Sequence, residues 1–491
     1  MTASTSIRVT LWAAAAAAVL VVAAPGRCES FALRPEWQVG QGEVRTADLT
    51  PTTPLPAPER LALREAIETA FKYNLSFRTT IEILLDGQSE LRVSEQRWAL
   101  TVGADIESVR NGVDTTGAVA TAGFTWSALT GSEFSVAAAL GSLSTRDYEI
   151  SYIHPLGRGK GRVSAANEAL RQARSSYRQS LLSFYLDQQD LAEAVVVAYF
   201  EAYKRDKLRA IEQKGLDLAE RALTDAEARR AEEENTIFDV TRAQFRVARA
   251  QQSLYRAQQL YGDGVDQLLR LLGLEIGGEP TLTTEPVYAP EPIDPAAAVA
   301  TALEQRAELS LLDLEIDDDR AVVRIERDAR RPRIDALAAV SRFSSGGQTE
   351  LLIGLRSSLP IRSRRLEEAA AIARRLLMVS EQDRHDWRQR IAAEVRNLAR
   401  AARAAEDNVE SAEQNLAAAQ VSLDAAQIFV EEGLGDNRNL IDAQDALTSS
   451  EALHLTAPID YYLTTVRLKR AVGENILEGL PEEAPPPVPA P

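Results

Sequence analysis

The fold is decided by residues 391–426, which read IAAEVRNLARAARAAEDNVESAEQNLAAAQVSLDAA. Apolar residues recur in this stretch at alternating steps of four and three positions. They are Ile391, Val395, Leu398, Ala402, Ala405, Val409, Ala412, Leu416, Ala419, Leu423 and Ala426. This a/d heptad pattern predicts a helix that needs a partner helix along its whole length.

The first half of the chain carries a similar series at intervals of seven. Its members are Leu170, Tyr177, Phe184, Leu191 and Ala198. The pattern predicts one helix over about 162–233, roughly 108 Å long at 1.5 Å per residue. Neighbouring helical segments, at about 60–98 and 237–272, are each near half that length. Two short helices stacked end to end would therefore cover one long helix.

Sharp reversals are predicted where the long helices stop, at residues 233–239 and 432–438. The second contains Gly433-Leu434-Gly435, and glycine ends a helix readily. The acidic run Glu232-Glu233-Glu234 at the first is either a solvated helix end or a surface for a basic partner. Pro458 lies inside the last helical segment, so we expect a kink or interruption there.

Alternation of apolar and polar residues with a period of two predicts strands over about 101–155 and 333–360. The clearest stretches are 118–126, 134–140, 148–152, 334–340 and 351–355. Alternating segments of about ten residues with aromatic ends are typical of outer-membrane barrels, although a soluble sheet would have the same pattern.

The same order of helix, strands, very long helix, break and helix occurs twice, which predicts two internal repeats. Each half closes on Leu-x-Arg-x-x-Gly, at Leu268–Gly273 and Leu468–Gly473. The expected organisation is a signal peptide (1–26), an extended segment (27–59), a first repeat (60–276), a crossing (277–295), a second repeat (296–475) and a Pro-rich disordered tail (476–491).

The amino terminus predicts export. Arg8 precedes an apolar run, Leu11 to Ala24, that is short for a membrane helix and is followed by small residues. Cys28 raises the possibility of a lipoprotein, but Arg27 occupies a position where lipidation requires a small residue. We therefore expect an unmodified thiol.

The composition argues against several classes of protein. The 491 residues carry a net charge of −17, which disfavours nucleic-acid binding. One cysteine excludes a disulfide framework, and His154, His385 and His454 lack the spacing of metal ligands. The glycine-rich stretch 157–161 lacks the spacing of a phosphate-binding loop and is interpreted as a strand exit. We expect no catalytic residue, no metal and no cofactor.

Taken in order, these motifs resemble the TolC-like outer-membrane efflux protein family over residues 60–475. The most specific stretch is 438–446, RNLIDAQDA, which is similar to the family's Arg-x-x-x-Asp-x-x-Asp-Ala after the second hairpin. In the first half, Asp239-Val240 resembles the corresponding tip.

The resemblance implies a mainly α fold in which helical hairpins form a trimeric α-barrel below a shared β-barrel in the outer membrane. It also implies a homotrimer in outer-membrane lipid, with a large periplasmic portion. Its hairpin tips would contact a periplasmic adaptor protein linked to an inner-membrane pump. The expected contact residues are Asn235, Thr236, Gly433, Leu434 and Gly435.

The matched motif also implies a gate. Asp442 and Asp445 are three apart and share a helix face, so three copies would place rings of carboxylates at the periplasmic aperture. Arg438 would hold the closed state as a latch with Asp239 of the neighbouring hairpin. Alternatively, all four are solvated charges at a helix end.

The first half is longer than the second by 27 residues, counted from Ala66 to Pro155 and from Ala298 to Pro360. We expect the surplus, around residues 118–140, to add a hairpin that prolongs an external loop or widens the barrel from twelve to eighteen strands. The predicted function is a passive exit duct for efflux or type I secretion and not an enzyme. The alternative is an exported structural coiled-coil protein without a barrel.

Overall fold

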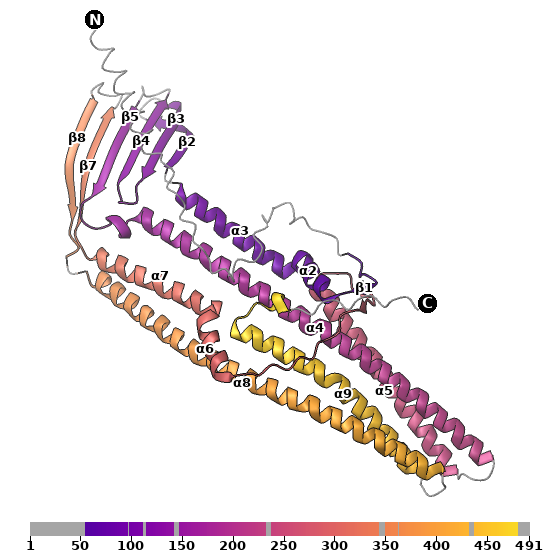
Figure 1. Cartoon of the computed structure of the whole chain (residues 1–491). Coiled ribbons are helices and arrows are strands. Elements are labelled where there is room, and N and C mark those ends of the chain that lie inside the picture. Colours follow the sequence, from indigo (N-terminus) through magenta and orange to yellow (C-terminus); the bar gives the residue numbers. More distant parts are fainter. Residues whose placement is uncertain are drawn as a thin grey trace, which may run out of the picture. The chain divides into compact units, whose positions relative to one another are not determined.

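The computed structural model describes residues 55–96, 98–110, 114–141, 147–231, 237–342, 349–361, 363–431 and 437–479, all within one compact unit, Arg45–Pro491 (Figure 1). The first half contains β1 (Arg60–Leu61), α2 (Leu63–Tyr73), α3 (Leu75–Glu95), β2 (Trp98–Arg110), β3 (Asp114–Ser127), β4 (Glu133–Gly141), β5 (Asp147–Pro155), η3 (Gly161–Val163), α4 (Ala165–Ala231) and α5 (Ile237–Leu272). The second contains β6 (Thr281–Leu282), α6 (Pro295–Gln305), α7 (Ala307–Ala329), β7 (Arg333–Arg342), β8 (Thr349–Ser358), α8 (Arg364–Glu431), α9 (Asn437–Val472) and η4 (Ile476–Gly479).

The helices of the two halves follow the same order and have nearly equal lengths. Helices α2 and α6 have 11 residues each, and α3 and α7 have 21 and 23. The long helices α4 and α8 have 67 and 68 residues, and α5 and α9 have 36 each. The halves differ in the sheet, to which the first contributes four strands and the second two.

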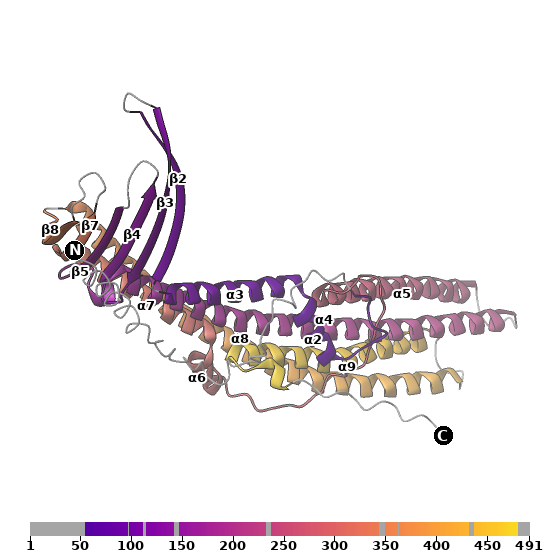
Figure 2. The ribbon, with the colours of Figure 1, turned by 90° about the horizontal axis from the view of Figure 1, so that it is seen from above.

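The helices form rows in which two short helices cover one long helix (Figures 1 and 2). Along α4 lie α3 and then α5, and along α8 lie α7 and then α9. Contacts between α4 and α9 join the two sets, so by their mutual contacts these four helices follow the order α5, α4, α9, α8. The prediction of end-to-end stacking is confirmed.

The predicted heptad residues of α8 face their partner helices. Ile391, Val395 and Ala402 are fully buried, and the other members of the series are buried or half-buried. The prediction of one helix over 60–98 was wrong, because the chain breaks at Asn74 into α2 and α3.

Of the kink or interruption expected at Pro458, the interruption does not occur, because α9 continues through this residue. The kink stays a prediction. A proline inside a helix removes one hydrogen bond and crowds the carbonyl four residues earlier. That residue, His454, is exposed, so water can satisfy its carbonyl group. Just beyond the proline, Ile459 and Leu463 are buried in the main core. Tertiary packing therefore outweighs the local preference.

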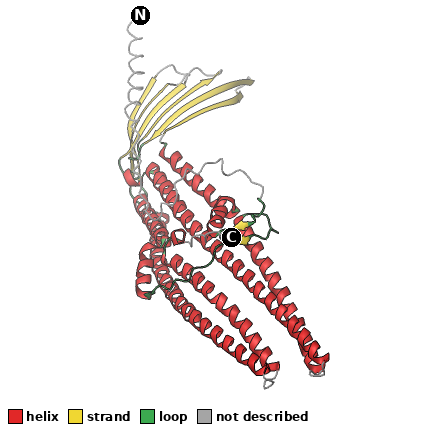
Figure 3. Cartoon of the chain, turned by 45° about the vertical axis from the view of Figure 1, so that its right-hand side comes forward, coloured by secondary structure: helices red, strands yellow, loops and turns green. Residues whose placement is uncertain are grey.

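The six longer strands form one antiparallel sheet in the order β2-β3-β4-β5-β7-β8 (Figure 3). Strands were predicted at all of these places. The surplus segment around 118–140 forms parts of β3 and β4, which pair with each other inside the sheet. The first half thus adds the predicted hairpin. Whether this hairpin prolongs an external loop or widens a barrel to eighteen strands stays a prediction.

A first junction joins α2, α3 and the end of α5. The Asn74 side chain accepts a hydrogen bond from the Phe77 amide and donates one to the Leu271 carbonyl at 2.8 Å. Gly273 ends α5 with φ of +72°, and a Cβ there would lie 2.4 Å from the Tyr73 carbonyl oxygen. The two helix ends therefore meet backbone to backbone through a neutral cap.

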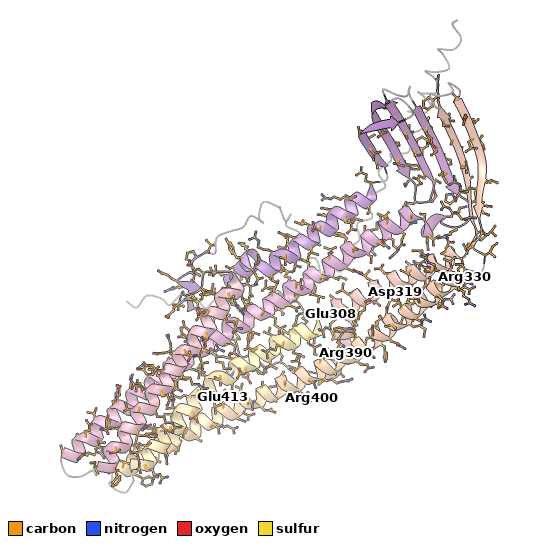
Figure 4. The ribbon with its side chains drawn as sticks, turned by 180° about the vertical axis from the view of Figure 1, so that it is seen from behind. Glu308, Asp319, Arg330, Arg390, Arg400 and Glu413 are labelled. Atoms are coloured by element: carbon orange, nitrogen blue, oxygen red, sulfur yellow. The ribbon has the colours of Figure 1, made fainter. Side chains whose placement is uncertain are left out.

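A second junction, between α6, α7 and the end of α9, has the same backbone plan but different chemistry. Arg306 takes the place of Asn74 between the two helices, and Gly473 takes that of Gly273 with φ of +94°. The guanidinium is 9% exposed and bonds Glu394 at 2.6 Å and Glu308 at 2.9 Å. Figure 4 marks Glu308 where α7 begins.

This second junction extends into α4 and α9. Arg470 lies 3.7 Å from Glu308 and 2.6 Å from Asp190, and Arg467 lies 4.0 Å from Glu193. Burial alone would raise the pKa of Glu308, but the hydrogen bonds and charge of Arg306 outweigh it, so the pKa is lowered. Burial raises the pKa of Glu193 against the opposing charges of Arg470 and Arg467.

Candidate functional site: the two-faced sheet and the helix tips

One face of the six-stranded sheet is apolar from edge to edge. Side chains directly opposite each other on neighbouring strands share a face, and the register places Leu100, Phe124, Val136, Ile150, Val340 and Leu351 in one row. The next row contains Trp126, Phe134, Tyr152, Ala338 and Ile353.

Much of this face is open to its surroundings. Leu100 is 65% exposed, Leu351 68% and Ile353 75%. A shallow apolar pocket on it is lined by Tyr152, Ala336, Ala338, Ile353 and Leu355 among others. Contiguous apolar surfaces of this extent mark contact with a membrane or with another protein.

The opposite face is mainly polar. Thr101, Thr121 and Thr125 lie on it, as do Ser135 and Ser151, whose hydroxyl oxygens are 2.6 Å apart. A Cβ on Gly103 or Gly123 would lie 2.8 Å from a threonine hydroxyl across the strand, so these glycines make room for the polar row. Larger apolar residues on this face include Ile153, Leu337 and Leu352.

Strands β2 and β8 are the two ends of the sheet order, and each has one edge without a partner strand within the described residues. An unpaired edge exposes a row of backbone donors and acceptors. The site is therefore an open sheet with one apolar face, one polar face and two edges that can accept another strand.

The tips of the helical hairpins flank the predicted reversals. Helix α4 ends at Ala231 and α5 begins at Ile237, while α8 ends at Glu431 and α9 begins at Asn437. The predicted contact residues Asn235, Thr236, Gly433, Leu434 and Gly435 lie outside the described residues, and so does the acidic run 232–234.

The predicted gate carboxylates lie in the first turns of α9, and each faces an arginine. Asp442 Oδ2 is 3.9 Å from Arg438 Nε in the same helix, with both side chains 69% exposed. Asp445 Oδ1 is 2.8 Å from Arg246 Nη2 of α5. Asp239 lies in the first turn of α5. The latch between Arg438 and Asp239 remains a prediction.

Sequence reasoning missed Arg246. Its guanidinium is 14% exposed and also donates a hydrogen bond to Gln444 Oε1 at 2.8 Å, so it ties α5 to α9 close to both tips. Arg246 lies seven residues after Asp239, a spacing that places both near one helix face. That spacing was the available signal, but it does not reveal that α9 is the neighbour.

The histidines have no shared site. The His154 ring accepts or donates a 2.6 Å hydrogen bond with Ser132 at the base of the sheet, and His385 and His454 lie far away on α8 and α9. Among the described residues, no three His, Cys, Asp or Glu side chains are placed to bind a metal ion. No helix in the described part of the chain is long and apolar enough to cross a membrane.

Comparison with known proteins supports the resemblance drawn from the sequence. Residues 298–474 match the family model described as outer membrane efflux protein. No curated protein matches the chain.

Several solved structures share the fold. The chain is similar to the outer membrane protein VceC from Vibrio cholerae, with 16% identity, a TM-score of 0.65, and coverage of 84% of this chain and 96% of that one. The CmeC outer membrane channel of Campylobacter jejuni aligns at 11% identity and a TM-score of 0.65, over 84% and 85% of the two chains. The open state of MtrE from Neisseria gonorrhoeae aligns at 14% identity and 0.58, over 87% and 94%.

Proposed function

We propose that this chain, a relative of the TolC-like outer-membrane efflux proteins, forms a passive exit duct across the outer membrane. The observation that carries the proposal is the sheet with one apolar and one polar face, attached to helical hairpins far longer than any membrane needs. A closed barrel built from such sheets presents apolar side chains to lipid and polar side chains to a water-filled interior.

The open sheet edges support closure by further copies of the chain. Pairing β8 of one copy with β2 of the next satisfies both edges, and a ring of three copies contains eighteen strands. The parallel order and matching helix lengths of the two halves support an internal duplication, with the long helices continuing as a periplasmic α-barrel.

We also propose that the hairpin tips, residues 233–239 and 432–438, contact a periplasmic adaptor that links the duct to an inner-membrane pump. In the assembled ring, Asp442 and Asp445 contribute carboxylates at the narrow end, and crowded like charges attract cations. Arg246 limits the free charge of Asp445, so Asp442 is the more available of the two.

The alternative of an exported coiled-coil scaffold without a barrel leaves the apolar face of the sheet without a role. The two are separated by purifying the full chain in detergent and adding it to planar lipid bilayers. A duct gives stepwise conductance and a trimer whose gel mobility changes on heating. A scaffold extracted without detergent that never conducts contradicts the proposal.

Charge removal in the same bilayers tests the gate. Replacing Asp442 and Asp445 together by Ala is expected to weaken cation selectivity and block by multivalent cations. Replacing Arg438 by Ser is expected to raise conductance by loosening the closed state. Asp383→Ala, at an exposed position of α8 far from the tips, is the matched control. Unchanged selectivity and conductance in both variants would place the constriction elsewhere.

A further inference from the structure

The two outermost helices of the row α5, α4, α9, α8 each carry a second heptad stripe, on the face that points away from their own hairpin partner. On α5 the inner positions run Val240, Ala243, Val247, Ala250 and Leu254, all buried or half-buried against α4. The opposite face runs at alternating steps of four and three through Phe238, Arg242, Phe245, Arg249, Gln252, Arg256 and Gln259, and all seven are exposed.

The outer face of α8 has the same spacing. Opposite its buried heptad series lie Asp407, Glu410, Gln414, Ala417, Val421, Asp424 and Ile428, again all exposed. The two outer faces include large apolar side chains that are well exposed. Phe238 is 78% exposed, Phe245 71%, Val421 69% and Ile428 55%. Large apolar side chains exposed along a helix face mark a surface that contacts another element.

The charges of the two stripes are opposite. Residues 240–262 of α5 contain four arginines and no acid, and residues 404–431 of α8 contain six acids and no lysine or arginine. Arg246 is used inside the chain by Asp445, while Arg242, Arg249 and Arg256 make no ion pair with another described residue. Figure 4 shows this part of α8, between Arg400 and Glu413 and onward to the tip, with side chains projecting from the edge of the row.

The stripes also match position by position when counted from the tips. Phe238 is the second residue of α5 and Ile428 the fourth from the end of α8. Both helices are counted away from the tip, which is forward along α5 and backward along α8, and the steps of four and three then coincide. The facing pairs are Phe238 with Ile428, Arg242 with Asp424, Phe245 with Val421, Arg249 with Ala417, Gln252 with Gln414, Arg256 with Glu410 and Gln259 with Asp407. The Arg246–Asp445 contact shows that the two hairpins of one chain are level, so the count has a common origin.

We propose that the α5 stripe of one copy packs against the α8 stripe of a second copy in the same orientation, and that the Arg–acid pairs fix the orientation and axial register of this contact. This inference rests on the proposed assembled duct and adds the surface that specifies it. Pairing two α5 stripes opposes arginine to arginine, and pairing two α8 stripes opposes acid to acid. Only pairing of an α5 stripe with an α8 stripe joins opposite charges. This pairing leaves one α5 stripe and one α8 stripe unpaired at the two ends, so further copies add in the same way until a ring closes.

Disulfide capture tests the register directly. The full-length chain with Cys28→Ser is given Phe245→Cys and Val421→Cys, extracted in detergent and oxidised. The inference predicts covalent dimers and trimers on a non-reducing gel. The control pair Phe245→Cys and Asp407→Cys is offset by fourteen residues, about 21 Å along a helix, and should give no such ladder.

Exchanging the charges tests the Arg–acid pairs between the two stripes. Arg242→Glu with Arg256→Glu should reduce the matched crosslink several-fold, and adding Asp424→Arg with Glu410→Arg should restore it, because the pairs are exchanged and not removed.

Bilayer conductance of the same cysteine variants separates this inference from the proposed function. Conducting assemblies that crosslink only through the offset pair, or that crosslink α5 to a polypeptide other than this chain, overturn the stripe pairing and leave the duct standing. Absence of assembly and conductance in the unsubstituted full-length chain contradicts the duct itself.

Discussion

The two junctions where short helices meet end to end share one backbone plan and differ in what fills it. In the first, Asn74 caps α3 and binds the end of α5 through neutral hydrogen bonds. In the second, Arg306 holds a set of carboxylates drawn from α7 and α8. A neutral cap is insensitive to pH, whereas a half-buried charge network depends on every member being ionised correctly. The same backbone arrangement is therefore stabilised in two ways, one insensitive to pH and one dependent on it.

The largest expected effect comes from the charged junction. Arg306→Ala leaves Glu394 without its arginine and Glu308 with Arg470 alone, at 3.7 Å. Removing one partner of a buried pair costs roughly 3 kcal/mol. Thermal unfolding of the detergent-solubilised protein, followed by helical circular dichroism, measures this loss. Arg320→Ala removes an arginine whose side chain is 52% exposed and serves as the control. Equal stability of the two variants would contradict the role given to Arg306.

The glycines that end α5 and α9 sharpen the comparison. Both have positive φ, so alanine costs about 1 kcal/mol at either position. At Gly273 the new Cβ would also lie 2.4 Å from the Tyr73 carbonyl oxygen, whereas at Gly473 the nearest atom is 3.3 Å away. Gly273→Ala should therefore lower the unfolding temperature clearly more than Gly473→Ala. The reverse order would mean that the second junction is the tighter one.

The neutral cap gives a smaller effect. Asn74→Ala removes the hydrogen bond to the Phe77 amide and the one to Leu271, and loss of an N-cap typically costs about 1 kcal/mol. The loss should be independent of pH between mild acid and neutrality, because no titrating group is involved. Asn74→Asp should recover the cap to Phe77 but not the donation to Leu271. Unfolding measured at several pH values checks both statements.

The smallest effect concerns the two glutamates of the charged junction. The raised pKa of Glu193 means that its contribution to stability is present below its unfolded pKa and is lost as pH rises through the folded value. Glu308 has a lowered pKa, so its contribution is present above the unfolded value and is lost as pH falls. Glu193→Gln should therefore stabilise at neutral pH and change little in acid, and Glu308→Gln should destabilise at neutral pH. Urea unfolding at neutral pH in which Glu193→Gln destabilises, or Glu308→Gln stabilises, would contradict the assignment.

The sequence predicted the elements whose patterns are long. The heptad series of α8, the alternating strands and the reversals near the tips could all be recognised, because each repeats one relationship many times. The break at Asn74 was missed because Leu75 and Phe77 continue the apolar periodicity across it. At Pro458 the helix is not interrupted, because packing around Ile459 outweighs the local preference of proline.

The candidate site was harder to predict for the same reason. The alternation of each strand could be read, but the face that it shares with other strands depends on register between segments nearly two hundred residues apart, such as Ile150 and Val340. Arg246 meets Asp445 across 199 positions. Single residues carry no pattern that identifies such a partner.

The equal lengths of α4 and α8, and of α5 and α9, constrain how such a protein can evolve. An inserted heptad in one helix would displace every later side chain by a full repeat against neighbours that had not changed. Viable lineages would then gain or lose heptads in all four helices together, through rearrangements that span both hairpins. A substitution that keeps the heptad pattern escapes this constraint, whereas helix length behaves as a single trait of the whole chain.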